Sequence, residues 1–179
     1  MRRHRLTAVV GCWLVALAAL GAAGDVIVTP LVTDGRVLAS FAAASAFDED
    51  TRELLASGLP VTFTYAVELR SPSVLWFDGT LARVEVAASA KYDTLSDTYQ
   101  VSKLIGGKVV WSESTRDQQQ VGAWMTAFEK IQLEPSGPLE PNREYYVQVR
   151  LYQRPRSRFS LWPWGGDDGS GRADFTYLR

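Results

Sequence analysis

The sequence contains very few of the side chains on which most catalytic sites depend. Histidine occurs once, at His4, and cysteine once, at Cys12, both close to the N-terminus. The rest of the chain therefore lacks a Ser–His–acid triad, a Cys–His dyad, and the imidazole and thiolate ligands of zinc sites. It cannot form an intrachain disulfide either, so a domain of about 155 residues must be held together by its hydrophobic core.

Other absences exclude further classes of protein. The sequence has no glycine-rich phosphate loop and no dinucleotide-binding fingerprint, because Gly106-Gly107 is too short and predicts a turn. Three of the 19 Lys and Arg residues (Arg2, Arg3 and Arg5) lie at the N-terminus, which leaves 16 against 20 Asp and Glu. This acidic balance does not support nucleic-acid binding. We therefore expect a protein that is not an enzyme and uses no metal or cofactor.

Residues 1–24 are predicted to be a targeting segment. A positively charged start precedes the apolar run Leu6–Leu20, and the small residues Gly21–Gly24 suit cleavage before Asp25. A retained membrane anchor is the alternative, because Leu6–Ala23 has 18 residues, the short limit of a membrane span. In both cases the positive charges predict that residues 25–179 are exported, as one domain, to the periplasm or cell envelope.

Most of the remaining chain has the alternation or the β-branched content of strands. Asp34-Gly35 and Gly106-Gly107 predict tight hairpin turns between such segments. The predicted strands are Val26–Leu31, Arg36–Ala42, Val61–Arg70, Val84–Tyr92, Asp97–Leu104, Lys108–Trp111, Tyr145–Leu151 and Ala173–Leu178.

Two segments predict helices at the connections. Phe47–Gly58 has Asp48 as a candidate N-cap and Gly58 as its stop signal. Asp117–Ile131, capped by Thr115 or Asp117, carries a helical stripe of Val121, Trp124, Met125 and Phe128. These elements together predict a mostly-β fold, an antiparallel β-sandwich that is immunoglobulin-like or a half-open barrel. A mixed α+β sheet is the alternative.

Three stretches carry a family resemblance. Leu54–Phe63, followed by Val67–Leu69 and Trp76–Asp78, resembles the opening motif of an uncharacterised bacterial exported family, domain of unknown function 4390. Lys91–Val101 resembles the second motif of that family, and Tyr146–Leu151 its penultimate strand. The resemblance covers most of residues 30–179 and is weakest over Arg154–Arg172. It implies an exported envelope protein and supplies neither an activity nor catalytic residues.

The segment Arg154–Gly166 is the candidate interaction loop, because it combines alternate arginines with two tryptophans between the last two strands. Exposed arginine and tryptophan suit a protein partner or a membrane surface. The alternative is that Trp162 and Trp164 fold back to cap one end of the sandwich. The candidate contact residues are Arg154, Arg156, Arg158, Phe159, Trp162 and Trp164.

Three functional interpretations follow from these observations. The first is a non-catalytic binding or scaffolding domain of the bacterial envelope. The second is a hydrolase that acts on glycan with two carboxylates across a cleft, although capping explains Asp48–Asp50 and turns explain Asp78, Asp93 and Asp97. The third is a membrane-anchored accessory subunit of an envelope complex, in which residues 6–23 stay in the membrane.

Overall fold

The computed structural model describes residues 26–73, 78–153 and 169–178, and strands make up most of these ranges. This confirms the prediction of a mostly-β fold. The elements in chain order are β1 (Ile27–Thr33), β2 (Arg36–Ala42), the 3-10 turn η1 (Ala44–Ala46), α1 (Glu49–Ala56), β3 (Val61–Ser71), β4 (Gly79–Asp93), β5 (Thr98–Ile105), β6 (Lys108–Thr115), α2 (Gln118–Thr126), β7 (Ala127–Leu133), β8 (Arg143–Gln153) and β9 (Gly169–Tyr177).

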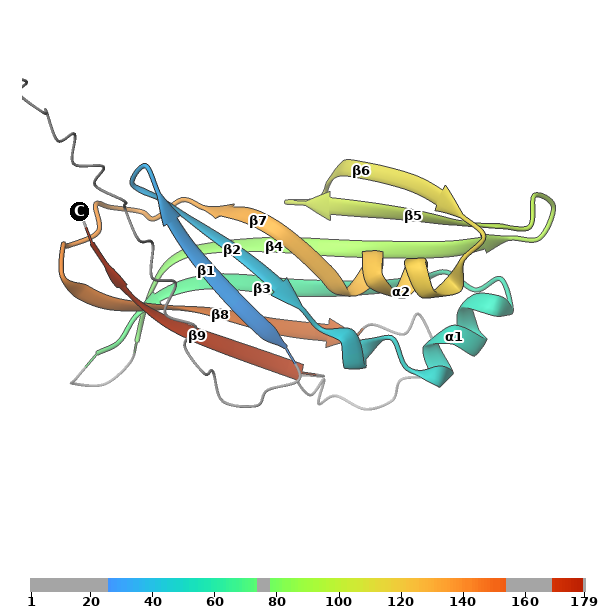
Figure 1. Ribbon diagram of the computed structural model, residues 1–179, viewed down its shortest axis with the longest axis horizontal. Coiled ribbons are helices and arrows are strands. Elements are labelled where there is room, and N and C mark those ends of the chain that lie inside the picture. The colour runs from blue at the N-terminus through green and yellow to red at the C-terminus, as the bar shows by residue number, and fades with distance from the viewer. Residues whose placement is uncertain (1–25, 74–77, 154–168, 179) are drawn as a thin grey trace, which may run out of the picture.

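The strands form two antiparallel sheets. The smaller sheet has the order β1-β2-β7 and the larger one the order β6-β5-β4-β3-β8-β9. Figure 1 shows the smaller sheet lying across one face of the larger sheet, with α2 beside it over the same face. β1 also runs next to β9, so edge strands of the two sheets meet on that side. The β-sandwich prediction is thus confirmed, with both helices in connections between strands.

The core lies between the two sheets and is centred on β3. As the period of two predicts, Phe63, Tyr65, Val67 and Leu69 point inward from this strand and are fully buried. The ring of Tyr65 lies 4.9 Å from that of Phe41 on β2 and 5.6 Å from that of Phe128 on β7, measured between centroids. These rings join the two sheets through the middle of the sandwich.

Turn and cap residues act as the sequence predicts. Asp34 and Gly35 have φ values of 50° and 73°, and Gly106 and Gly107 have 56° and 79°, which are the left-handed values of a tight hairpin turn. The Asp48 carboxylate accepts a hydrogen bond of 2.8 Å from the Thr51 backbone N–H and caps α1. At the start of α2, the carboxylate of Asp117 accepts from the Gln119 N–H at 2.8 Å.

The second predicted helix is wrong over its last five residues, 127–131. The helix ends at Thr126, and residues 127–133 form β7, which pairs with β2. The last backbone carbonyls of α2 accept hydrogen bonds from residues elsewhere in the fold, and not from the N–H groups of a further helical turn. The Tyr65 hydroxyl donates to Met125 O at 3.0 Å, and the Ala43 N–H donates to Thr126 O at 2.9 Å. Tertiary hydrogen bonds therefore override the helical period.

The Lys103 side chain on β5 completes this helix-to-strand junction. Its ammonium donates to Ala127 O at 2.8 Å and lies 4.9 Å from the centre of the Phe128 ring. Burial lowers the pKa of Lys103. Phe128, predicted to belong to the helical stripe, is buried as a strand residue, whereas Trp124 stays on the helix and packs against Trp111 at 4.9 Å.

Candidate interaction site

The predicted interaction loop lies outside the described residues. All six of its candidate contact residues fall within 154–168, so the hypothesis about their role stays a prediction. The sites described below are built from the strands and turns that the structure places. They comprise a charged cluster on the outer face of the larger sheet and a cavity at one end of the sandwich.

Glu68 is the centre of the charged cluster. It alternates with the core residues Val67 and Leu69 and therefore points to the face of the larger sheet that the smaller sheet does not cover. Its residue is only 3% exposed. One carboxylate oxygen accepts from Arg83 on β4 at 3.1 Å, and the other accepts from Arg150 on β8 at 2.7 Å. Two arginines from flanking strands thus neutralise one buried carboxylate.

Tyr146 on β8 forms the second half of the cluster and is only 2% exposed. The guanidinium carbon of Arg172 on β9 lies 3.6 Å from the centre of its ring, and that of Arg70 on β3 lies 5.9 Å from it. The Tyr146 hydroxyl donates a hydrogen bond of 2.5 Å to the Asp78 carboxylate. The ring is therefore held by cation–π contacts and its polar end by a charge-assisted hydrogen bond.

Further hydrogen bonds fix the arginines. Arg70 donates to Gln148 Oε1 and to Asp78 O, each at 3.1 Å. Arg172 donates to its own carboxylate partner, Asp174, at 2.5 Å. We refer to these side chains together as the outer-face cluster: Glu68, Arg70, Asp78, Arg83, Tyr146, Gln148, Arg150, Arg172 and Asp174.

No sequence motif predicts this cluster. Its members lie on four strands and, for Asp78, in the turn before β4, and none of them was predicted to belong to an interaction site. The available signal was a run of arginines and acids at outward positions of predicted strands, which also fits an ordinary solvated face. The burial of Glu68 and Tyr146 depends on strand order, which the alternation does not reveal.

The hydrogen bond between Tyr146 and Asp78 makes a prediction about acid stability. The bond lowers the pKa of Asp78 below its usual 3.8. A lowered carboxyl pKa stabilises the fold above the unfolded pKa, and this contribution is lost as the pH falls through the folded pKa. We expect the melting temperature of Asp78→Asn to fall less between pH 7 and about pH 3 than that of the unaltered protein.

The matched control for this measurement is Asp34→Asn. Asp34 lies in an exposed hairpin turn with a positive φ, a position that asparagine also favours. This variant should keep the pH dependence of the unaltered protein. An equal drop in melting temperature for Asp78→Asn and the unaltered protein would contradict the role assigned to the Tyr146–Asp78 bond.

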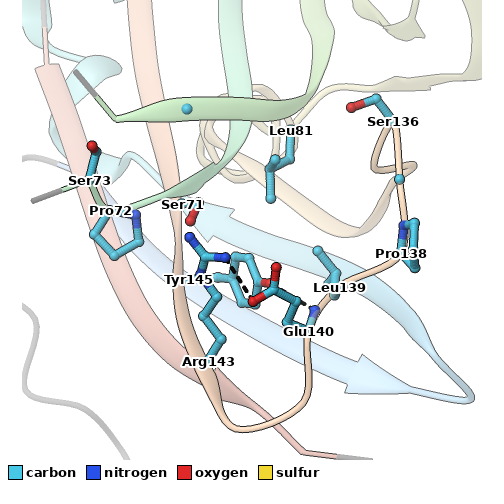
Figure 2. A pocket seen from close by; sticks show the side chains of 12 residues that line it. Ser71, Pro72, Ser73, Leu81, Ser136, Pro138, Leu139, Glu140, Arg143 and Tyr145 are labelled. Carbon is cyan, nitrogen blue, oxygen red and sulfur yellow. Dashed lines mark hydrogen bonds and ion pairs between the residues drawn. The ribbon is translucent and has the colours of Figure 1, made fainter. Parts of the chain in front are cut away.

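A cavity of about 590 Å³ opens at the end of the sandwich where β3 ends and β4 begins. Figure 2 shows that residues from these strands, from the β7–β8 loop and from the start of β8 line it. Leu81, Leu139, Pro72 and Pro138 supply apolar walls. The Ser71 hydroxyl oxygen at the wall is buried and makes no hydrogen bond to any residue in the described ranges.

The polar side of this cavity is an ion pair between Glu140 and Arg143, with 2.9 Å between carboxylate oxygen and guanidinium nitrogen. The Tyr145 hydroxyl accepts from the Glu140 N–H at 2.9 Å. Within the part of the chain that the structure describes, Glu140 is the one carboxylate of the lining. The described lining of the cavity therefore does not offer the two facing carboxylates that a glycosidase uses, and the hydrolase interpretation gains no support from it.

Comparison with family models identifies the family to which this sequence belongs. The model of a family described as Domain of unknown function (DUF4390) matches residues 26–156. The chain belongs to this family. The DUF4390 match begins at the first described residue and runs through β8, so it includes the whole cavity lining and Glu68. Arg172 and Asp174 on β9 lie beyond the matched range.

The DUF4390 description names no activity, so the function must be argued from the site itself. Neither the curated proteins nor the solved structures contain a match to the chain. Among the described residues, no group of three or more histidine, cysteine, aspartate or glutamate side chains is arranged to hold a metal ion. In the same ranges, neither helix has the length and apolar character needed to cross a bilayer.

Proposed function

We propose that this protein is an exported, non-catalytic domain of the bacterial envelope that binds a partner protein through the outer face of its larger sheet. The observation that carries the proposal is the outer-face cluster, in which arginines are held in place around Tyr146 and Glu68. Arginine is enriched among residues that dominate binding energy. Side chains that are already fixed lose less conformational entropy when a partner binds.

The chemistry of the cluster favours a partner with acidic or aromatic side chains. The side chains of Arg83 and Arg172 are about half exposed, so their guanidinium groups can meet a second molecule while keeping their present carboxylates. Planar guanidinium groups bind carboxylates with two hydrogen bonds and stack on aromatic rings. A sheet face with such groups suits a protein surface better than a small substrate.

Photo-cross-linking in the native host tests this surface. A photoreactive amino acid is placed at Glu85 or Ser170, two exposed positions beside the cluster on β4 and β9, and as a control at Thr29 on β1 of the smaller sheet. A protein adduct of one defined mass at the first two positions, and none at Thr29, supports the proposal. Adducts to lipid alone, equal adducts at all three positions, or none at any position would refute it.

The role of the candidate interaction loop, Arg154–Gly166, in binding is tested in the same cells. The double substitution Trp162→Ala and Trp164→Ala should weaken adduct formation without changing the melting temperature if the loop contributes to binding. A large fall in melting temperature would instead place the two tryptophans in the core, as the capping alternative states.

Export is tested by expressing the protein with its own N-terminus in a bacterial host, fractionating the cells and measuring the intact mass. Loss of residues 1–24 with protein in the periplasm supports the free exported domain. Full-length protein in the membrane fraction favours the anchored accessory subunit, since Leu6–Ala23 is at the short limit of a span. Full-length protein in the cytoplasm contradicts export.

A further inference from the structure

The tip of the β4–β5 hairpin exposes a leucine almost completely. Leu95 is 97% exposed, more than any other large apolar side chain in the described ranges. Single exposed leucines are common on protein surfaces and need no explanation by themselves. Leu95 differs from such residues because side-chain hydrogen bonds hold the turn that carries it.

Hydrogen bonds within the tip hold Leu95 outward. The Asp93 carboxylate accepts from the Leu95 N–H at 2.9 Å, and this bond lowers the pKa of Asp93, so the carboxylate stays charged. The Tyr92 hydroxyl donates to the Asp97 carboxylate. The hydroxyls of Ser96 and Thr98 lie 2.7 Å apart. The tip therefore presents one apolar side chain flanked by two carboxylates. Because hydrogen bonds already fix the conformation of the turn, it loses less conformational entropy when it binds.

The end cavity lies at the opposite end of the same strand. β4 starts at Gly79, which lines the cavity, and ends at Asp93 in the tip. Its 15 residues separate these ends by roughly 45 Å at a strand rise of about 3.3 Å per residue. Figure 1 shows the hairpin tip and the β7–β8 loop at opposite ends of the long axis. A tip therefore cannot reach the cavity of its own chain.

The two ends are complementary in character. The apolar walls of Leu81, Leu139 and the two prolines can receive the leucine side chain, and the cavity volume of about 590 Å³ exceeds what one such side chain fills. The Arg143 guanidinium at the cavity can keep its bond to Glu140 and still bind a carboxylate of the tip, because it has five N–H donors.

We propose that copies of this domain associate head to tail, with the β4–β5 tip of one copy inserted into the end cavity of the next. Each copy has one tip and one cavity, so every contact leaves a free tip and a free cavity. The assembly therefore grows as a line or closes as a ring. This inference does not depend on the outer-face cluster, because the two surfaces share no residue.

Sedimentation velocity of the purified exported chain tests the contact. The sedimentation coefficient should rise between about 10 μM and about 1 mM, the range expected for a small interface. Leu95→Asp removes the apolar side chain, and Ser136→Glu places a negative charge at the exposed cavity rim, opposite the acidic tip. Each variant alone should stay monomeric over the whole range, with an unchanged melting temperature.

Mixing the two variants gives the decisive result. The Ser136→Glu copy keeps an intact tip and the Leu95→Asp copy an intact cavity, so an equimolar mixture should form a dimer with one copy of each and grow no further. Val109→Asp, at an exposed apolar position on β6, is the control and should associate like the unaltered protein. A monomeric wild type, association of either variant alone, a monomeric mixture, or loss of association in Val109→Asp would each overturn the proposal.

Discussion

Replacing Gly171 with alanine should lower the free energy of unfolding by about 3 kcal/mol, the upper range for forcing atoms into a packed site. Gly171 is a buried residue of β9 that lies beside the start of β1. A methyl group there would stand 2.0 Å from the backbone oxygen of Val26 and 2.8 Å from its carbonyl carbon. Because these are backbone atoms, the clash can be relieved only by moving one strand away from the other.

Chemical denaturation measured by far-ultraviolet circular dichroism checks this result, and Gly137→Ala is the matched control. Nothing lies within 4 Å of a methyl group added at Gly137, so this variant should change the free energy of unfolding by less than about 0.5 kcal/mol. If Gly171→Ala were as stable as Gly137→Ala, the close approach of β1 and β9 would not belong to the folded state in solution.

Replacing Glu68 with alanine is expected to cost about 3 kcal/mol of stability, at the lower end of what breaking a buried ion pair costs. The substitution leaves the guanidinium groups of Arg83 and Arg150 without the carboxylate that both of them bind. The lower end applies because the Arg83 side chain is 56% exposed and water partly screens it. Glu68→Gln keeps an oxygen acceptor and should cost less than alanine.

Glu113→Ala, at an exposed position on β6, serves as the control for Glu68→Ala and should be nearly neutral. The two variants are compared in the same denaturation experiment at pH 7. Equal stability of Glu68→Ala and Glu113→Ala would mean that Glu68 does not hold the outer-face cluster together, and the proposed binding surface would lose its central support.

The sequence predicts the local elements of this fold well. Alternation in Val61–Arg70, the glycine turns at residues 35 and 106–107, and the Asp48 cap each depend on neighbouring residues, and each is found where predicted. The α2–β7 junction was not predicted because the residues that end the helix are distant from it in the sequence. Tyr65, Ala43 and Lys103 supply the donors that end the helix, and no local pattern contains them.

The candidate sites were harder to predict than the fold, for a related reason. Glu68 and Arg150 lie 82 positions apart and meet because β8 pairs with β3. The cavity likewise needs the β7–β8 loop to approach the end of β3. Leu95 was visible in the sequence as an apolar residue between two aspartates, but its exposure depends on the turn that the flanking side chains build.

The burial of Val26, which is 3% exposed against Gly171, has a consequence for the proposal that residues 1–24 are a cleaved leader. A leader that ends at Gly24 is separated from Val26 by Asp25 alone, a reach of about 3.5 Å per residue. A peptidase needs an extended, accessible chain on both sides of the bond that it cuts, so on the proposal that residues 1–24 are removed we expect the cut to precede the docking of Val26 beside β9.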